Sequence, residues 1–167
     1  GDPNDALAVR NRAETWDEWP VAWAEIGDGY LAVGTDRQAR GHGLSAAAAF
    51  VRAAICFHFA QVVAFHLPAL KTELQVRKTD AFAMAAPLMS PPAERLDMPF
   101  ADTVLPAYLR VPADRDGPVP GILLVPGLDS TKEDFATVMD IAVARGLAVL
   151  AFDGPGQGEA HPGLLLG

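Results

Sequence analysis

Ser45 comes nearest to a catalytic nucleophile, because it lies in the segment 43–47, Gly-Leu-Ser-Ala-Ala. A Gly-x-Ser-x-Gly sequence can turn a strand sharply into a helix and present the serine hydroxyl for attack on a carbonyl. The segment lacks the second glycine of this pattern, and no apolar strand precedes Ser45. Since a serine hydroxyl can also accept a free N–H of the first helical turn, we expect Ser45 to be a helix N-cap.

His58 is a second candidate, because an imidazole can shuttle protons or bind a metal ion near neutral pH. It stands between Phe57 and Phe59 in an apolar stretch. A lone histidine in such a stretch is more typical of a hydrogen-bonded core residue, and we interpret His58 in this way. The catalytic or ligating alternative stays open at this point.

The apolar segment 121–125 predicts a strand, and the residues that follow it form a third candidate region. The next four residues, 126–129 (Pro-Gly-Leu-Asp), predict a loop. Ser130 together with Glu133 then forms a capping box that opens a helix reaching about Arg145.

Glycine commonly follows the end of a helix, so Gly146 is expected to be the C-cap of this one. The apolar segment 147–152 predicts another strand. Strand, helix and strand with short connections predict a right-handed βαβ unit with parallel strands. The residues 153–159, Asp-Gly-Pro-Gly-Gln-Gly-Glu, lack the third glycine of a dinucleotide-binding turn and the lysine of a P-loop. We therefore expect no nucleotide or other cofactor, and we expect Asp153 to hold the turn through hydrogen bonds to the backbone.

The first part of the chain predicts three to four helices in a small bundle or a helical array. A short helix is expected to begin at 2–4, with Trp16 as a potential member of it. The next begins near Trp19 or Pro20, because proline is tolerated in a helix only in its first turn.

Two longer helices follow in the same part. An apolar, alanine-rich segment predicts one helix over 46–65, with Pro68 marking its end. Charged residues on one face and apolar residues on the other predict an amphipathic helix over 69–86.

The second part of the chain predicts the start of an α/β sheet. Apolar and aromatic residues indicate two strands of a hairpin, 95–100 and 104–111. Pro106 removes a backbone donor, so the second strand is expected at or near a sheet edge. A turn is expected at 114–117, and the strand 121–125, apolar on both faces, is expected inside a covered sheet.

Composition changes near 90–94, Ser-Pro-Pro-Ala-Glu, where the alanine-rich part gives way to one rich in glycine, proline and valine. This change predicts two domains, a helical one over 1–90 and an α/β one over 91–167.

Net charge and cysteine content narrow the function classes. The 13 basic and 21 acidic side chains give a formal charge of −8, which excludes a nucleic-acid binder built on a basic surface. Cys56 is the only cysteine, so neither an intrachain disulfide nor a cysteine-based zinc site is expected, and a reducing, cytoplasmic location is favoured. Polar side chains interrupt the apolar run 44–70, which predicts a buried helix and no membrane span.

The order of these elements resembles that of the α/β-hydrolase superfamily. Two motifs narrow the resemblance, 127–133 (Gly-Leu-Asp-Ser-Thr-Lys-Glu) and 152–159 (Phe-Asp-Gly-Pro-Gly-Gln-Gly-Glu), which are similar to those of its FrsA-like branch. A helical region ahead of the core and the junction 91–95, Pro-Pro-Ala-Glu-Arg, also resemble that branch. The resemblance covers most of the chain and implies an α/β class: an N-terminal helical domain followed by the first strands of an α/β-hydrolase core.

The resemblance implies a serine-type hydrolase that acts on a carbonyl-containing small molecule, at an ester or a carbon–carbon bond. In this branch the helical domain covers the pocket and can support a homodimer, and neither a cofactor nor a metal is implied. The sequence stops at Gly167, before the strand and elbow that would carry the nucleophile and before the acid and the histidine. None of the triad residues is therefore expected in this chain, and the 167 residues alone are expected to be inactive.

The resemblance also implies an electrostatic role for the loop 126–129. The backbone N–H of Leu128 matches one donor of an oxyanion hole, and Gly127 permits the tight approach. Without the resemblance, this loop would be interpreted as an ordinary connection between strand and helix.

Three polar residues next to that loop, Asp129, Ser130 and Thr131, are not expected to be catalytic. Helix capping explains Ser130, and Asp129 can stabilise the same positive helix end. Neither Asp129 nor Asp153 is assigned to a triad. A second function class stays open, a non-catalytic helical interaction or ligand-binding module attached to a remnant of a hydrolase core.

Overall fold

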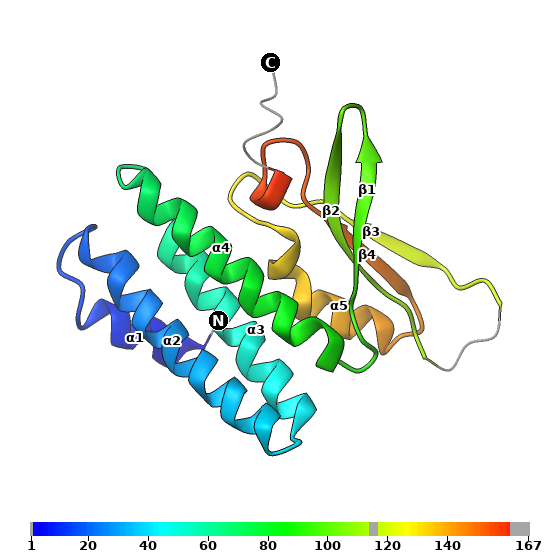
Figure 1. Cartoon of the computed structure of the whole chain (residues 1–167), viewed down its shortest axis with the longest axis horizontal. Coiled ribbons are helices and arrows are strands. Elements are labelled where there is room, and N and C mark those ends of the chain that lie inside the picture. The colour runs from blue at the N-terminus through cyan, green and yellow to red at the C-terminus, as the bar shows by residue number, and fades with distance from the viewer. Residues whose placement is uncertain (1, 114–116, 161–167) are drawn as a thin grey trace. The chain divides into compact units, whose positions relative to one another are not determined.

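The computed structural model describes residues 2–113 and 117–160. The chain divides into two compact units, Gly1–Leu88 and Met89–Gly167, which are described separately (Figure 1). The turn expected at 114–117 lies outside the described residues except for Gly117, which has a φ of 87°.

The first unit is helical throughout its described elements. Its parts are α1 (Pro3–Arg10), α2 (Glu18–Ala39), α3 (Gly43–Val62), α4 (Pro68–Ala85) and a short 3-10 turn (Ala86–Leu88). Helix α3 packs against both α2 and α4, and α1 packs on α2 (Figure 1). This arrangement confirms the predicted small helical bundle.

Aromatic rings of α3 fill the contact with α2. Phe50 and Phe57 are fully buried. Gly27 and Gly34 of α2 face these rings so closely that a Cβ at either position would overlap a ring. The two glycines therefore set how closely α2 and α3 approach.

The connection between α1 and α2 differs from the prediction for Trp16. Helix α1 ends at Arg10, so Trp16 belongs to neither helix. The Glu18 carboxylate accepts the backbone N–H groups of Glu14 (2.8 Å) and Thr15 (3.1 Å), which holds the chain in a turn there. Helix α2 begins at Glu18, within two residues of the expected start.

The N-cap prediction for Ser45 is wrong. Helix α3 begins at Gly43, so Ser45 lies inside its first turn, and His42 is the N-cap without a side-chain cap hydrogen bond. The N–H of Ala46 donates to the carbonyl of His42 at 2.9 Å, so the helical hydrogen bonds already begin there. Gly41, with a φ of 78°, reverses the chain just ahead of this point.

Helix α3 also ends earlier than predicted. The helix ends at Val62 instead of residue 65, and Pro68 is the first residue of α4. A proline in the first turn of a helix loses no hydrogen bond, which explains why Pro68 starts a helix here.

Helix α3 is long and apolar enough to cross a membrane by length and composition alone. In the helical unit, 56% of the apolar window is buried. Core helices of globular proteins share these properties, so the composition by itself carries no membrane assignment.

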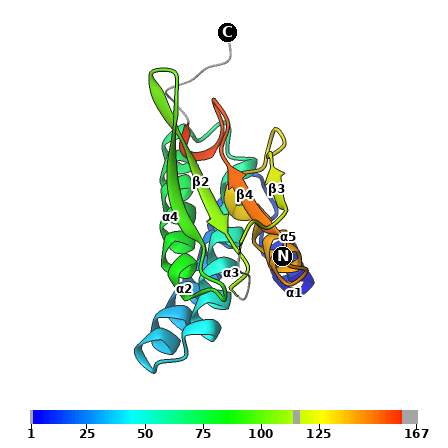
Figure 2. The ribbon, with the colours of Figure 1, turned by 90° about the vertical axis from the view of Figure 1, so that its right-hand side faces the viewer.

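The second unit consists of strands and one α-helix among its described residues. Its parts are β1 (Glu94–Phe100), β2 (Thr103–Arg110), β3 (Gly121–Leu124), a 3-10 turn (Lys132–Phe135), α5 (Ala136–Val143), β4 (Ala148–Phe152) and a second 3-10 turn (Gly158–Ala160). The strand order in the sheet is β1-β2-β4-β3, and Figure 2 shows β2, β4 and β3 side by side.

Strand pairing confirms the predicted hairpin and the parallel pair. β1 and β2 are antiparallel, with Phe100 opposite Thr103 at the turn. β3 and β4 are parallel and are connected through α5, as expected for a βαβ unit. β2 pairs with β4 in the antiparallel direction, so the sheet is mixed. The fold is therefore a helical part followed by the first strands of an α/β core, as predicted.

Three local predictions for this unit can be compared with the structure. Pro106 lies on the second strand from the edge, as predicted, and its carbonyl accepts the N–H of Asp153 at 2.9 Å. Helix α5 ends at Val143 with Ala144 as its C-cap, so it stops before the predicted end near Arg145, and Gly146 is not the C-cap. Gly146, with a φ of 79°, reverses the chain after the helix, where the N–H of Leu147 donates to the carbonyl of Ala142 at 3.1 Å. The expectation that β3 lies inside a covered sheet is wrong for the described residues, because β3 is the last strand of the order and Leu123 is 59% exposed.

The predicted capping box is shifted by one residue. Thr131 is the N-cap, and its N–H donates to the Asp134 carboxylate at 2.8 Å. Ser130 therefore does not cap the helix. Glu133, the expected partner of Ser130, instead accepts the hydroxyl of Thr131 at 2.6 Å.

Candidate functional site

The candidate functional site is formed by two loops that follow the parallel strands. Residues 125–131, the β3 loop, follow β3, and residues 153–157, the β4 turn, follow β4. Because the two strands are parallel neighbours, both loops leave the sheet at the same edge. The carboxyl edge of the strands is where ligands bind in open α/β sheets.

Leu128 lies at the tip of the β3 loop. Its side chain is fully exposed, and its backbone N–H has no acceptor among the residues that the structure describes. The loop is closed behind it by the Ser130 N–H, which donates to the carbonyl of Gly127 at 3.4 Å. A backbone donor at this tip is available to a ligand.

Gly127 leaves space over the loop backbone. A Cβ at this position would approach only the side chains of Ser130 (3.8 Å) and Asp129 (4.0 Å), both ordinary contact distances. No neighbour within the described chain therefore requires a glycine here. The predicted role, close approach of another group to the backbone, stays a prediction.

The side chain of Gln157 joins the β4 turn to the β3 loop. Its Nε2 donates to the carbonyl oxygens of Gly127 (2.6 Å) and Pro126 (3.3 Å). Its Oε1 accepts the backbone N–H of Gly154 at 3.2 Å. Both polar ends of the amide are thus engaged with backbone groups.

A buried charge cluster lies directly behind these loops. Lys132 is fully buried, and its Nζ contacts the carboxylates of Glu133 (2.5 Å), Asp153 (2.7 Å) and Glu159. Asp153 also accepts the backbone N–H of Lys132 at 2.8 Å. Arg95 extends the cluster toward solvent through an ion pair with Glu159 at 3.0 Å.

Burial and the neighbouring charges shift the pKa of Lys132 in opposite directions. Burial alone would lower the pKa of Lys132, but the surrounding carboxylates raise it above its ordinary value, so the ammonium stays charged. Tyr108, itself buried, has its ring centre 5.9 Å from the Lys132 Nζ. Burial, followed by the charge of Glu133, raises the pKa of Tyr108.

The same three carboxylates lie close enough together to suggest a metal site. One oxygen each from Glu133, Asp153 and Glu159 falls within 4.8 Å of the others. The Lys132 ammonium already contacts all three side chains. A metal ion would have to displace this internal cation, so the geometry is that of a buried ion-pair cluster.

Asp153 confirms the prediction that it holds the β4 turn. Its carboxylate accepts the N–H of Glu159 at 3.1 Å. Gly158, with a φ of 46°, lies so close to this carboxylate that a Cβ would overlap it. Sequence reasoning missed the second role of Asp153, its ion pair with Lys132.

The two candidates in the helical unit are ordinary structural residues by their surroundings. Ser45 is exposed in the first turn of α3. His58 is buried, as predicted for a core residue, and its ring lies edge-on to Phe59 at 5.6 Å between centroids.

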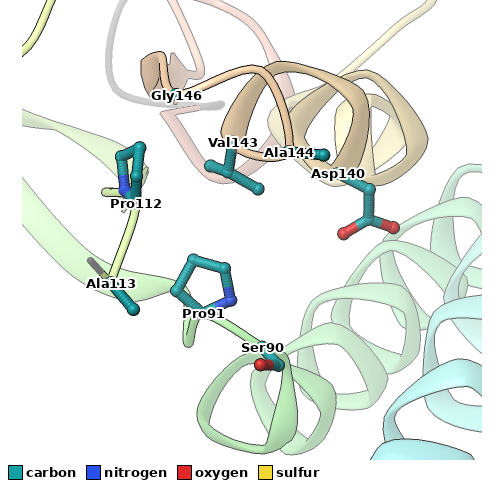
Figure 3. A pocket seen from close by; sticks show the side chains of 8 residues that line it. All are labelled: Ser90, Pro91, Pro112, Ala113, Asp140, Val143, Ala144 and Gly146. Atoms are coloured by element: carbon teal, nitrogen blue, oxygen red, sulfur yellow. The ribbon is translucent and has the colours of Figure 1, made fainter. Parts of the chain in front are cut away.

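The second unit also holds an open groove of about 530 Å³ (Figure 3). It is lined by Ser90, Pro91, Pro112, Ala113, Asp140, Val143, Ala144 and Gly146. Gly146 precedes β4, so this groove lies at the opposite end of the strands from the β3 loop and the β4 turn. Asp140 pairs at its rim with the buried guanidinium of Arg110 at 2.5 Å, so the charged groups there have a structural role.

The fold and the loop geometry together define the N-terminal portion of an α/β-hydrolase. Residues 12–162 match the family described as "Esterase FrsA-like", and the chain belongs to this FrsA-like family.

Individual relatives agree with the family assignment. The chain is 36% identical over 158 residues to 2,6-dihydropseudooxynicotine hydrolase of Paenarthrobacter nicotinovorans, covering 93% of this chain and 41% of the relative. It is 33% identical over 148 residues to the hydrolyase poxO of Penicillium oxalicum, covering 85% of this chain and 35% of the relative.

Solved structures also match the N-terminal portion of such hydrolases. The crystal structure of 2,6-dihydroxy-pseudo-oxynicotine hydrolase superposes with a TM-score of 0.84 at 35% identity, covering 95% of this chain and 44% of that chain. AbyA5, at a TM-score of 0.57 and 22% identity, shares the fold. The chain thus spans less than half the length of the proteins that it matches.

Proposed function

We propose that this sequence supplies the helical domain and the oxyanion-binding loop of a serine-type α/β-hydrolase that acts on a carbonyl-containing small molecule. The bond cleaved is an ester or a carbon–carbon bond next to a carbonyl, in keeping with the hydrolases named among the relatives. The observation that carries the proposal is the backbone N–H of Leu128 at the carboxyl edge of the parallel strands, for which residues 2–113 and 117–160 provide no acceptor.

The chemistry of this donor is electrostatic. When a nucleophile attacks a carbonyl, negative charge develops on the oxygen, and a backbone N–H aimed at that oxygen lowers the barrier by roughly 2.7 to 4 kcal/mol. The Leu128 N–H serves as one such donor. The nucleophile, its histidine and its acid come from outside these residues, since the 167 residues contain no Gly-x-Ser-x-Gly segment.

The proposal also covers the binding partners and the cellular location of the protein. Its partner is the small-molecule substrate, with a homodimer as a further option through the helical domain, and neither nucleic acid nor membrane takes part. A cytoplasmic location is proposed because Cys56 is the only cysteine of the sequence and can form no intrachain disulfide, which suits a reducing compartment.

A first test is the parent reading frame together with the intact mass of the protein. Continuation beyond Gly167 into a Gly-x-Ser-x-Gly elbow is the expected result. A reading frame that ends there would instead favour the helical interaction or ligand-binding module.

A second test compares two substitutions of Leu128 in the full-length polypeptide, with hydrolysis of p-nitrophenyl acetate as the assay. Leu128→Ala keeps the N–H, so turnover is expected to stay near the unmodified level. Leu128→Pro deletes the N–H and is expected to lower kcat by a factor on the order of 10². Far-UV circular dichroism and a crystal structure check the fold of the proline variant. A folded Leu128→Pro protein with unchanged turnover would remove Leu128 from the mechanism.

A further inference from the structure

Gln157 is held in one conformation by the turn that carries it. Its own N–H donates to the carbonyl of Gly154 at 3.0 Å, and its carbonyl accepts the N–H of Ala160 at 2.8 Å. Its Oε1 is fixed by the Gly154 N–H at 3.2 Å. The Nε2 group therefore points at the β3 loop with little rotational freedom.

The contact of Nε2 with the carbonyl of Gly127 acts on the peptide group that also contains the Leu128 N–H. A trans peptide is planar, so the carbonyl oxygen of Gly127 and the amide hydrogen of Leu128 point in opposite directions from one rigid plane. Holding the oxygen at 2.6 Å from Gln157 Nε2 therefore aims the N–H away from Gln157, toward the open side of the loop.

The loop itself contains little else that would fix this plane. The only other hydrogen bond to the Gly127 carbonyl within the described residues is the one from the Ser130 N–H, which is long at 3.4 Å. The Leu128 side chain is fully exposed and packs against nothing described. The orientation of the Gly127–Leu128 peptide therefore depends mainly on Gln157.

From this geometry we infer that Gln157 is a positioning residue that orients the Leu128 N–H as an oxyanion donor. The inference rests on the proposed function of Leu128. Gln157 touches neither the substrate nor the reacting atoms, and it acts through the peptide plane alone.

The test is a double-substitution cycle in the full-length polypeptide, assayed with p-nitrophenyl acetate. Gln157→Leu removes both hydrogen bonds to the β3 loop and is expected to lower kcat roughly tenfold while KM changes less than about threefold, because a misaimed donor retains part of its effect. Gln38→Leu makes the same chemical change at an exposed position of α2 and is expected to leave kcat unchanged.

The cycle separates positioning from general stability. In a Leu128→Pro background the donor is absent, so adding Gln157→Leu is expected to cause no further loss of kcat. A crystal structure of Gln157→Leu is expected to show a rotated Gly127–Leu128 peptide. Additive losses, or an unrotated peptide, would overturn the inference.

The experiment distinguishes failure of the proposed function from failure of the inference about Gln157. If Leu128→Pro leaves kcat unchanged, the oxyanion role of Leu128 is wrong, and the inference about Gln157 is rejected with it. If Leu128→Pro lowers kcat and Gln157→Leu does not, only the inference about Gln157 is rejected.

Discussion

The buried cluster behind the two loops makes Lys132 a residue whose loss should be costly to the second unit. We consider Lys132→Met, which keeps a long apolar side chain of similar reach and removes the charge. Lys132, Glu133 and Asp153 are each 0% exposed. The variant therefore removes the Lys132 ammonium from two fully buried carboxylates, whereas the partly buried Glu159 keeps its ion pair with Arg95.

Removing one member of a buried ion pair costs about 3 to 5 kcal/mol, because the remaining charge is buried without compensation. Native domains are stable by only about 5 to 15 kcal/mol, so this loss is a large fraction of the total. In a unit of this size each kcal/mol corresponds to about 4 to 8 °C in Tm, so even the lower value predicts a fall of about 12 to 24 °C.

The pH dependence of the ion pair has a definite sign. The pKa of Lys132 is raised in the folded state, so its stabilisation is fully present below the ordinary lysine value of 10.5 and is lost as the pH rises above it. The unmodified protein is expected to lose this stabilisation in alkaline solution, whereas Lys132→Met has none to lose.

The assay must report on the second unit alone. Trp16, Trp19 and Trp23 all lie in the helical unit, so their fluorescence follows that unit and serves as an internal control. Hydrogen exchange of the β2 and β4 amides follows the sheet. Arg145→Met is the matched control, because it removes one positive charge from an exposed position of the same unit, and a change within about 0.5 kcal/mol is expected. An unfolding free energy of Lys132→Met within about 1 kcal/mol of the unmodified protein at pH 7 would refute the reasoning.

Two further predictions concern the 167-residue chain by itself. A serine-directed fluorophosphonate is expected to give no stoichiometric label, because the chain contains no elbow serine; labelling of Ser45 would place a nucleophile in the helical unit. The chain is also expected to bind an apolar fluorescent dye at the β3 end of the sheet, where Leu123, Val125 and Leu128 are 59%, 61% and 101% exposed. A compact monomer by sedimentation with no dye binding would contradict the interpretation that this part of the core is incompletely covered.

Much of the fold could be predicted from the sequence because periodicity and glycine or proline positions act locally. The hairpin, the parallel pair and the chain reversal at Gly146 after α5 all follow from short segments. The errors also have local causes. Ser130 and Thr131 are both good caps, and what decides between them is the Asp134 carboxylate, which binds the N–H of Thr131.

The candidate site was harder to predict because its contacts join segments far apart in the chain. Lys132 and Asp153 are separated by a helix and a strand, and nothing in the sequence near Lys132 shows that its ammonium is buried. Gln157 likewise stood in a glycine-rich turn with no sign that its amide reaches Gly127. Such pairs depend on the alignment of β3 and β4, which periodicity does not specify.

The mixed strand order has a consequence for how the chain acquires its structure during synthesis. The hairpin of β1 and β2 can form as soon as it is made, but two strands alone are marginally stable in water. β2 finds its second neighbour only when β4 is present, since Ala107 pairs with Phe152 and Arg110 with Val149 across about forty residues. The helical unit, whose described helices pack mainly on their neighbours in sequence, can fold as soon as it is synthesised, whereas the sheet must wait for its last described strand. The hairpin is therefore exposed, with one unpaired edge on β2, for the time that the ribosome needs to add α5 and β4.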